Sequence, residues 1–243
     1  MIEQAWEGGL VAILNVGTDL ASSRAAVALA ERYERIFAAV GVHPHDAKTV
    51  TPRVLDELRA LARHPKVVAV GEIGLDYYRD LSPRPVQRRA FTDQLALASA
   101  LELPVVIHSR EAHDDVLAAL REWERARGRG RSKPRPRGVL HSYSAGPERL
   151  EEVIELGFSI GISGPVTFPK ADRLRATAAA VPLERLLVET DCPYLTPKPY
   201  RGRRNQPAYV RYVVEAVARA RGTSAREVAR ATTDNSRRLF GVL

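Results

Sequence analysis

The sequence predicts an α/β fold in which short parallel strands alternate with amphipathic helices. Apolar, β-branched runs of four to seven residues recur along the chain, as expected for parallel strands that are buried on both faces. The segments between these runs carry apolar residues at three- and four-residue spacing, which is typical of helices that cover a sheet. The alternation continues without an internal boundary, which indicates a single domain over residues 1–243.

Each apolar run that we predict as a strand is followed by a helical or turn-rich segment. The predicted strands are Leu10–Val16, Ile36–Val42, Val67–Ile73, Pro104–His108, Gly138–His141, Phe158–Ser163 and Leu186–Thr190. Helical patterns include TPRVLDELRALARH (51–64) and RRAFTDQLALASAL (88–101), and the chain opens on a short helix at Ile2–Trp6. Ser224 stands three residues before Glu227, and this capping signature is expected to open the last helix.

A closed TIM-like (β/α) barrel contains eight strands, whereas this sequence supplies seven. We therefore expect a TIM-like barrel whose first strand is missing. Loss of that strand would leave two unpaired sheet edges, which proteins generally avoid. A partner subunit could cover such an edge, so an oligomer stays open as an interpretation.

The composition excludes several classes of protein. Hydrophobic residues make up 45% of the chain, which is enough for a large core and is unlike a disordered protein. No apolar run approaches the roughly 20 residues that span a bilayer, so we expect no membrane partner. The opening MIEQAWEGG lacks the basic and apolar regions of a secretory signal. Cys192 is the single cysteine and cannot form an internal disulfide, which favours a cytoplasmic location.

The net charge of +8 is concentrated in two segments. Residues 121–137 carry a local charge of +6 and residues 198–204 carry +4, so the rest of the chain sums to −2. Clustered basic charge attracts polyanions such as nucleic acid. For the first segment, a solvated surface loop over Arg125–Gly138 is an equally good interpretation.

Metal-binding side chains stand at the ends of five predicted strands. They are His43 and His45, Glu72, His108, His141 and Asp191. The carboxyl ends of barrel strands open on one face, so these side chains are expected to share a catalytic rim. A single histidine at a strand end is more simply a hydrogen-bonded structural residue, but this set holds four of the six histidines. Imidazole and carboxylate together suit Zn, Mn, Fe or Mg and predict a metal-dependent hydrolase.

Specific sequence blocks surround these residues. They are NVGTDLASS (15–23), GVHPHD (41–46), GEIGLDYYRD (71–80), PVVIHSREAHDD (104–115), VLHSYS (139–144), SGPVTFPKADRLR (163–175), LLVETDCPYLTP (186–197) and RGRRNQPAYV (201–210). In this order they resemble the TatD family of metal-dependent deoxyribonucleases over nearly the whole chain. The resemblance implies a TIM-like barrel of the amidohydrolase type. It also implies divalent-metal hydrolysis of phosphodiesters, often as a 3′-to-5′ exonuclease on single-stranded DNA or RNA.

The resemblance further implies roles for individual residues. One or two divalent ions (Mg, Mn or Zn) would be held by Glu72, His108, His141 and Asp191. Glu72 and Asp191 would be catalytic, with Asp191 taking the proton from the attacking water. Residues on the substrate side would be His43, His45, Arg110, Arg203 and Asn205. A solvated loop is a comparable interpretation of Arg203 and its neighbour. Tyr77, Tyr78 and Tyr194 could stack on a base, although core packing is at least as good a reading.

The chain departs from the family pattern at its start. Family members open with a strand carrying Asp-x-His-x-His, whose histidines bind the second metal, and no His-x-His precedes Asn15. The expected first strand and the two expected histidine ligands therefore belong to the same missing segment. The recorded start could lie too far downstream, which we favour because no other block looks decayed. A short form with one metal at Glu72, His108 and His141, or a truncated inactive protein, are the alternatives.

Two other functions stay open at this point. Related barrels hydrolyse amides and esters with similar ligands, so the chain could be a non-nuclease hydrolase of the amidohydrolase type. The basic segments and the absent ligands would also suit an inactive nucleic-acid-binding protein. His43 and His45 share the His-x-His spacing and could substitute as ligands, although their family counterparts occupy a different strand.

Overall fold

The computed structural model of the protein describes residues 1–127 and 137–242. These residues form two compact units. The β1–β4 unit comprises Ala12–Val139 with Leu239–Val242, and the β6–β7 unit comprises Met1–Val11 with Leu140–Arg238. Within the described residues, no helix combines the length and the apolar character that crossing a membrane requires.

The strands of the β1–β4 unit are parallel and follow one another in chain order. Ile13 of β1 lies opposite Ile36 of β2, and Val70 of β3 lies opposite Val105 of β4, while the register shifts once between β2 and β3 and once between β3 and β4. The strands are β1 (Ile13–Val16), β2 (Ile36–Val40), β3 (Val67–Asp76) and β4 (Val105–Arg110), and β5 (Gly138–Leu140) begins at the end of the unit. Ile36, Ala38 and Ala39 have exposures of 1% or less, as a strand covered on both faces requires.

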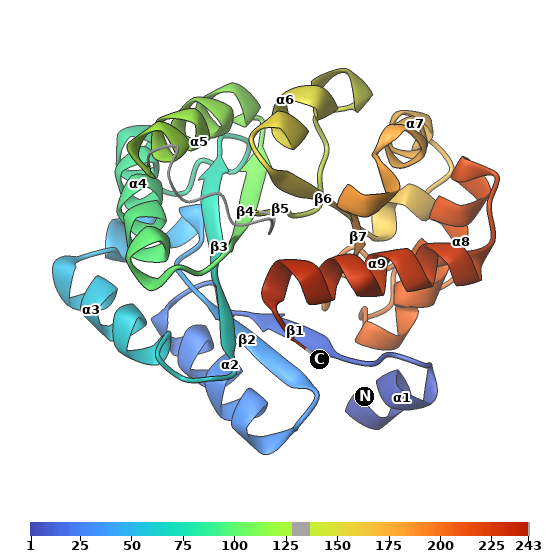
Figure 1. Ribbon diagram of the computed structural model, residues 1–243, viewed down its shortest axis with the longest axis horizontal. Helices are drawn as coiled ribbons and strands as arrows, with labels where there is room; N and C mark the ends of the chain where they lie inside the picture. The colour runs from blue at the N-terminus through green and yellow to red at the C-terminus, as the bar shows by residue number, and fades with distance from the viewer. Residues whose placement is uncertain (128–136, 243) are drawn as a thin grey trace. The chain divides into compact units, whose positions relative to one another are not determined.

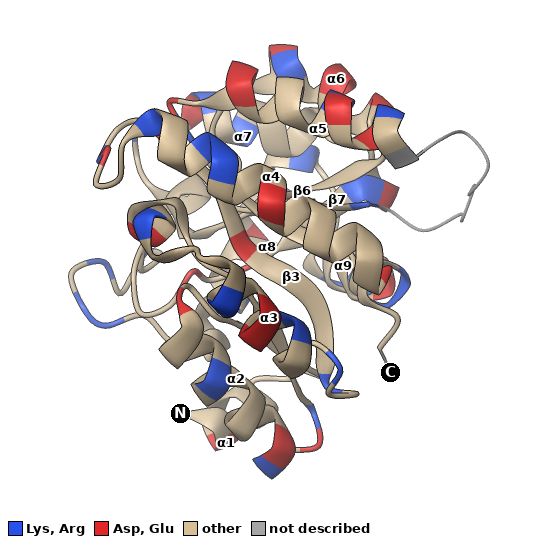
Figure 2. Cartoon of the chain, turned by 90° about the vertical axis from the view of Figure 1, so that its left-hand side faces the viewer, with Lys and Arg blue, Asp and Glu red and all other residues tan. Residues whose placement is uncertain are grey.

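Helices connect these strands and lie along their outer side (Figure 1). They are α2 (Leu20–Arg32), the 3₁₀ segment η1 (Pro44–Thr49), α3 (Pro52–Leu61), α4 (Arg84–Leu101) and α5 (His113–Arg127). Asp19 caps α2 by accepting from the backbone of Ser22, and Thr51 caps α3 in the same way. Figure 2 shows that α3 exposes both signs of charge, so its outer face is an ordinary solvated surface.

The β6–β7 unit contains two parallel strands that pair with each other, together with several helices. Strand β6 (Phe158–Ile162) pairs with β7 (Leu186–Val188), with Ile160 opposite Leu186. The helices are α1 (Ile2–Glu7), η2 (Pro147–Arg149), α6 (Leu150–Glu155), η3 (Gly164–Thr167), α7 (Asp172–Ala180), η4 (Leu183–Arg185), η5 (Pro207–Tyr209), α8 (Val210–Arg221) and most of α9 (Ala225–Phe240). Ser224 Oγ accepts from Glu227 N at 3.1 Å, which confirms the predicted cap of the last helix.

Every predicted strand is present, and the strand–helix alternation confirms the α/β class. The ends differ by a few residues. Strand β3 continues to Asp76, beyond its predicted end at Ile73, because the buried Leu75 and Asp76 still pair with β4. The predicted loop Arg125–Gly138 has its described ends in α5 and β5, and residues 128–136 lie outside the described residues.

Candidate metal centre

Strands β3 and β4 bring three ionisable side chains together in the β1–β4 unit. Glu72 and Asp76 stand four residues apart on β3, a spacing that places both on one face of a strand. His108 lies on β4, directly opposite Gly74. A Cβ at Gly74 would collide with the backbone carbonyl of His108, and the φ of Gly74 is +141°. Glycine at this position therefore lets β4 approach closely enough to set His108 between the two carboxylates.

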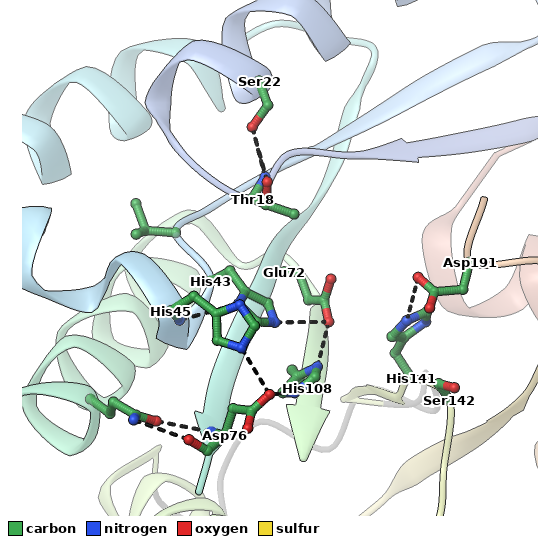
Figure 3. A network of polar contacts seen from close by, with 12 residues as sticks. Thr18, Ser22, His43, His45, Glu72, Asp76, His108, His141, Ser142 and Asp191 are labelled. Atoms are coloured by element: carbon green, nitrogen blue, oxygen red, sulfur yellow. Dashed lines mark hydrogen bonds and ion pairs between the residues drawn. The ribbon is translucent and has the colours of Figure 1, made fainter. Parts of the chain in front are cut away.

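His108 contacts both carboxylates through its two ring nitrogens (Figure 3). Nδ1 lies 2.9 Å from Oε1 of Glu72, and Nε2 lies 3.1 Å from Oδ2 of Asp76. Burial alone would lower the pKa of the imidazole, but the hydrogen bonds to Asp76 and Glu72 outweigh it, and the pKa of His108 is raised. The negative charges of the two carboxylates therefore stabilise a positively charged group between them.

Asp76 is the site residue that sequence reasoning did not single out. Its side chain is 1% exposed. Oδ1 accepts from the backbone N–H groups of Tyr78 and Arg79 at 3.0 and 2.8 Å, while Oδ2 lies 2.9 Å from Nε2 of His45 and 3.1 Å from His108. Burial would raise the pKa of Asp76, but these hydrogen bonds lower it overall, so the carboxylate is ionised at neutral pH.

His43 is buried and neutral. Its exposure is 8%, and burial is the largest cause that lowers its pKa to about 3. Nδ1 accepts from the backbone N–H of His45 at 3.2 Å, so the ring proton of the neutral imidazole is on Nε2. Nε2 lies 3.7 Å from Oε1 of Glu72. His43 therefore presents a hydrogen-bond donor beside Glu72.

Three of these side chains form a cluster whose nitrogen and oxygen atoms are of the kind that bind metal ions. His43, Glu72 and His108 each offer one nitrogen or oxygen atom, and these atoms lie within 4.8 Å of one another. Imidazole nitrogen combined with carboxylate oxygen suits Zn or Mn, and the adjacent ionised Asp76 adds the negative charge that favours a divalent cation. The residues present therefore fit a divalent metal ion.

A second pair of predicted ligands meets in the β6–β7 unit. Nε2 of His141 lies 3.4 Å from Oδ1 of Asp191, and Nδ1 lies 2.9 Å from Oε2 of Glu189 (Figure 3 labels His141 and Asp191). Glu189, which sequence reasoning did not select, also accepts from the backbone N–H of Ser142. A Cβ at Gly161 would come within 2.7 Å of Glu189, so glycine leaves room for this carboxylate. Glu189 orients the His141 ring and directs Nε2 toward Asp191.

The predicted substrate-side residues lie in different surroundings. The Arg110 guanidinium stacks 3.8 Å above the ring of Tyr78, whose side chain is 56% exposed. Arg203 is exposed, with its guanidinium 5.8 Å from the ring centroid of Tyr200. Both arginines thus keep a charged group at the surface beside an aromatic ring.

Asn205 is 1% exposed and bonds to the backbone around Asp191. Its Nδ2 donates to the carbonyls of Thr190 and Tyr194, both at 2.6 Å, and its Oδ1 accepts from the N–H of Gln206. The side chain therefore braces the turn that carries Asp191, a role that the sequence pattern did not reveal because burial is not visible in it.

Comparison with known proteins places the chain in a family. The family model described as TatD related DNase matches residues 1–241. A Bacillus subtilis protein named Uncharacterized metal-dependent hydrolase YabD is 40% identical over 242 residues, which cover 100% of this chain and 92% of that protein. A Klebsiella pneumoniae protein named 3'-5' ssDNA/RNA exonuclease TatD is 39% identical over 248 residues, covering 100% of this chain and 91% of that protein.

The solved structures agree with the sequence relatives. The crystal structure of YjjV, a TatD homologue from Escherichia coli, superposes with a TM-score of 0.90 at 33% identity, covering 99% of this chain and 90% of that one. This likeness confirms the predicted TIM-like α/β fold. The chain therefore belongs to the TatD family of metal-dependent hydrolases.

Proposed function

We propose that this protein is a divalent-metal-dependent exonuclease that removes nucleotides from the 3′ end of single-stranded DNA or RNA. The observation that carries the proposal is the cluster of Glu72, His108 and His43, in which one nitrogen or oxygen atom of each residue lies within 4.8 Å of the others. Glu72 and His108 would bind the metal ion, and His43 would face the substrate. Relatives named 3'-5' ssDNA/RNA exonuclease, which are 36–39% identical over the whole chain, support the substrate class. The basic segment 198–204, with no acidic residue, also suits a polyanionic substrate.

The proposed ligands of the divalent ion or ions are Glu72, His108, His141 and Asp191. A divalent ion held by such ligands supplies Lewis acidity toward a phosphoryl oxygen and lowers the pKa of a coordinated water.

The chain's own side chains would orient the substrate and move the proton. Asp191 Oδ1, which lies 3.4 Å from His141 Nε2, is the proposed acceptor of the proton from the attacking water. Nε2–H of the neutral His43 would donate to a phosphate oxygen. Arg110 and Arg203 would each contact a phosphate group of the substrate.

Hydrolysis of a labelled oligonucleotide tests the proposal. A single strand labelled at its 5′ end is incubated with the protein and Mg, Mn or Zn, and the products are separated by length. We expect a ladder that shortens one nucleotide at a time, because removal from the 3′ end keeps the label. Glu72→Gln and Asp191→Asn are each expected to slow the reaction by at least about a hundredfold, since both remove charge from the reacting centre.

Matched controls separate chemistry from folding. Glu215→Gln and Asp93→Asn change carboxylates that pair with arginines at the surface, and both should cleave as the wild type does. Circular dichroism checks that every variant is folded. Internal fragments in place of a ladder would refute exonuclease action, and hydrolysis of amide or ester substrates without cleavage of nucleic acid would refute the proposed substrate class.

A further inference from the structure

A stretch of the β6–β7 unit is rich in aromatic and basic side chains and free of acids. Residues 192–214 contain five Lys or Arg, no Asp or Glu, and four of the eight tyrosines of the chain. We call these nine side chains the aromatic–basic patch: Tyr194, Lys198, Tyr200, Arg201, Arg203, Arg204, Tyr209, Arg211 and Tyr212. All five cationic residues are exposed, and none of them forms an ion pair with a carboxylate in the described part of the chain.

The aromatic rings of the patch are ordered against one another. Tyr200 and Tyr209 stack with ring centroids 4.5 Å apart and planes at 7°. Tyr212 meets both rings edge-on, at centroid distances of 5.6 and 6.0 Å. The guanidinium of Arg211 lies 4.6 Å above the Tyr212 ring, and that of Arg203 lies 5.8 Å from Tyr200. Three tyrosine rings and two arginine groups therefore lie together in this part of the unit.

Hydrogen bonds to backbone carbonyl groups connect this surface to the turn that carries Asp191. The N–H of Tyr194 donates to the carbonyl of Asp191 at 2.9 Å, and Asn205 Nδ2 donates to the carbonyl of Tyr194 at 2.6 Å. Thr196 Oγ1 donates to the carbonyl of Arg203 at 2.5 Å. Tyr194 itself is 71% exposed, so its ring is accessible to a ligand. The patch thus begins beside Asp191 and extends through η5 to α8.

We propose that the aromatic–basic patch is a track for single-stranded nucleic acid, which holds the part of the strand that lies beyond the nucleotide being removed. This inference rests on the proposed function for its substrate class. Tyrosine faces stack on unpaired bases regardless of sequence, and exposed arginine and lysine groups that form no close ion pair bind the phosphates between the bases. A duplex hides its base faces within its own stack, so stacking on tyrosine selects single strands. The track would raise affinity for long strands more than for short ones.

Binding of a single-stranded oligonucleotide tests the track apart from cleavage. The probe is a fluorescent strand of about 20 nucleotides with phosphorothioate linkages that resist hydrolysis, and anisotropy is measured with the intact protein and Mg. Tyr194→Ala and Tyr209→Leu are each expected to weaken binding about tenfold, because each removes one stacking face. Tyr209→Phe keeps the ring and should bind as the wild type does. Arg211→Gln should reduce the slope of log affinity against log salt by about 0.7.

Arg219→Gln is the matched control for Arg211→Gln. It changes an exposed arginine of the same helix, 4.0 Å from Glu215, and should leave both affinity and salt slope unchanged.

Thermal melting checks that each variant is folded. If Tyr209→Leu unfolds, the Tyr194→Ala and Arg211→Gln variants, which change exposed residues, still test the track. Wild-type affinity in both of these folded variants would overturn the track, even if the protein cleaves nucleic acid. A duplex of the same length that binds as tightly, with the same losses, would also overturn it. Binding that depends on Tyr194 in a protein that hydrolyses no oligonucleotide would support the track and refute the proposed function.

Discussion

Nε2 of His108 lies 3.1 Å from Oδ2 of Asp76, a carboxylate that is 1% exposed. The other nitrogen of the same ring is directed at Glu72. Because Oδ1 of Asp76 is held by two backbone N–H groups, Asp76 is a rigid support for the His108 ring. A carboxylate in this position orients a ligand histidine and increases its basicity.

Asp76→Asn should therefore weaken metal binding. The substitution preserves the size of the side chain but removes the charge that fixes His108. We expect affinity for Zn or Mn to fall by about 10- to 100-fold, measured by isothermal titration calorimetry. Asp93→Asn, at an exposed ion pair with Arg89, is the control and should bind as the wild type does. Unchanged affinity in Asp76→Asn would contradict the orienting role.

Glu189→Gln should act in the same way on His141. The 2.9 Å contact from Glu189 to Nδ1 keeps the His141 proton on that nitrogen, and the neutral amide would hold it more weakly. We expect kcat for oligonucleotide cleavage to fall by about 10- to 100-fold. Glu184→Gln, at an exposed position of the same unit, should leave kcat unchanged. A fall in kcat in both variants would show that the effect is not specific to the His141 contact.

Most of the scaffold could be predicted because its physical signals are local. Apolar runs identify the buried parallel strands, and polar residues at their ends identify Glu72, His108, His141 and Asp191 as candidates. Asp76 was not predicted as a site residue because the expected end of β3 was Ile73, and an aspartate beyond a strand end suggests a solvated turn. Its signal was the two-residue period that it shares with Glu72, which becomes visible only once the strand is extended to Asp76.

The supporting roles of Glu189 and Asn205 could not be predicted from the sequence for a different reason. Glu189 adjoins Asp191 in the same motif, and nothing local distinguishes the residue that faces a reacting group from the residue that supports a neighbour. Asn205 stands among exposed arginines, so its 1% exposure follows from the packing of the Asp191 turn and not from its own surroundings in the sequence. Support roles depend on contacts between segments that are distant along the chain, such as His141 with Glu189.

Asn205→Ala should destabilise the fold and loosen the Asp191 turn. It removes the donor that satisfies the carbonyls of Thr190 and Tyr194, and unsatisfied polar groups of this kind cost about 1–3 kcal/mol. We expect the free energy of unfolding in urea to fall by about that amount. Gln206→Ala is the control, since only the backbone N–H of Gln206 takes part in the network. Equal unfolding free energies for Asn205→Ala and the wild type would contradict the bracing role.

The cap of α2 should contribute stability that depends on pH. Asp19 accepts from the N–H and the hydroxyl of Ser22, each at 2.6 Å, and these hydrogen bonds lower the pKa of Asp19 from its ordinary value of 3.8. A carboxyl group with a lowered folded-state pKa stabilises the fold fully above its unfolded pKa, and this stabilisation is lost as the pH falls through the folded value. Asp19→Ala should therefore reduce the free energy of unfolding by about 1 kcal/mol at neutral pH, as loss of an N-cap generally does.

Asp19→Asn separates the charge from the cap, because the amide oxygen still accepts from Ser22 but does not titrate over this range. The advantage of the wild type over Asp19→Asn should be constant from about pH 7 to about pH 5 and then shrink below about pH 4, since only the wild-type side chain gains a proton there. Urea unfolding at a series of pH values measures the difference directly, and other acid-sensitive groups cancel because both proteins contain them. A difference that stays constant down to about pH 3 would mean that the Asp19 charge contributes nothing beyond its hydrogen bond.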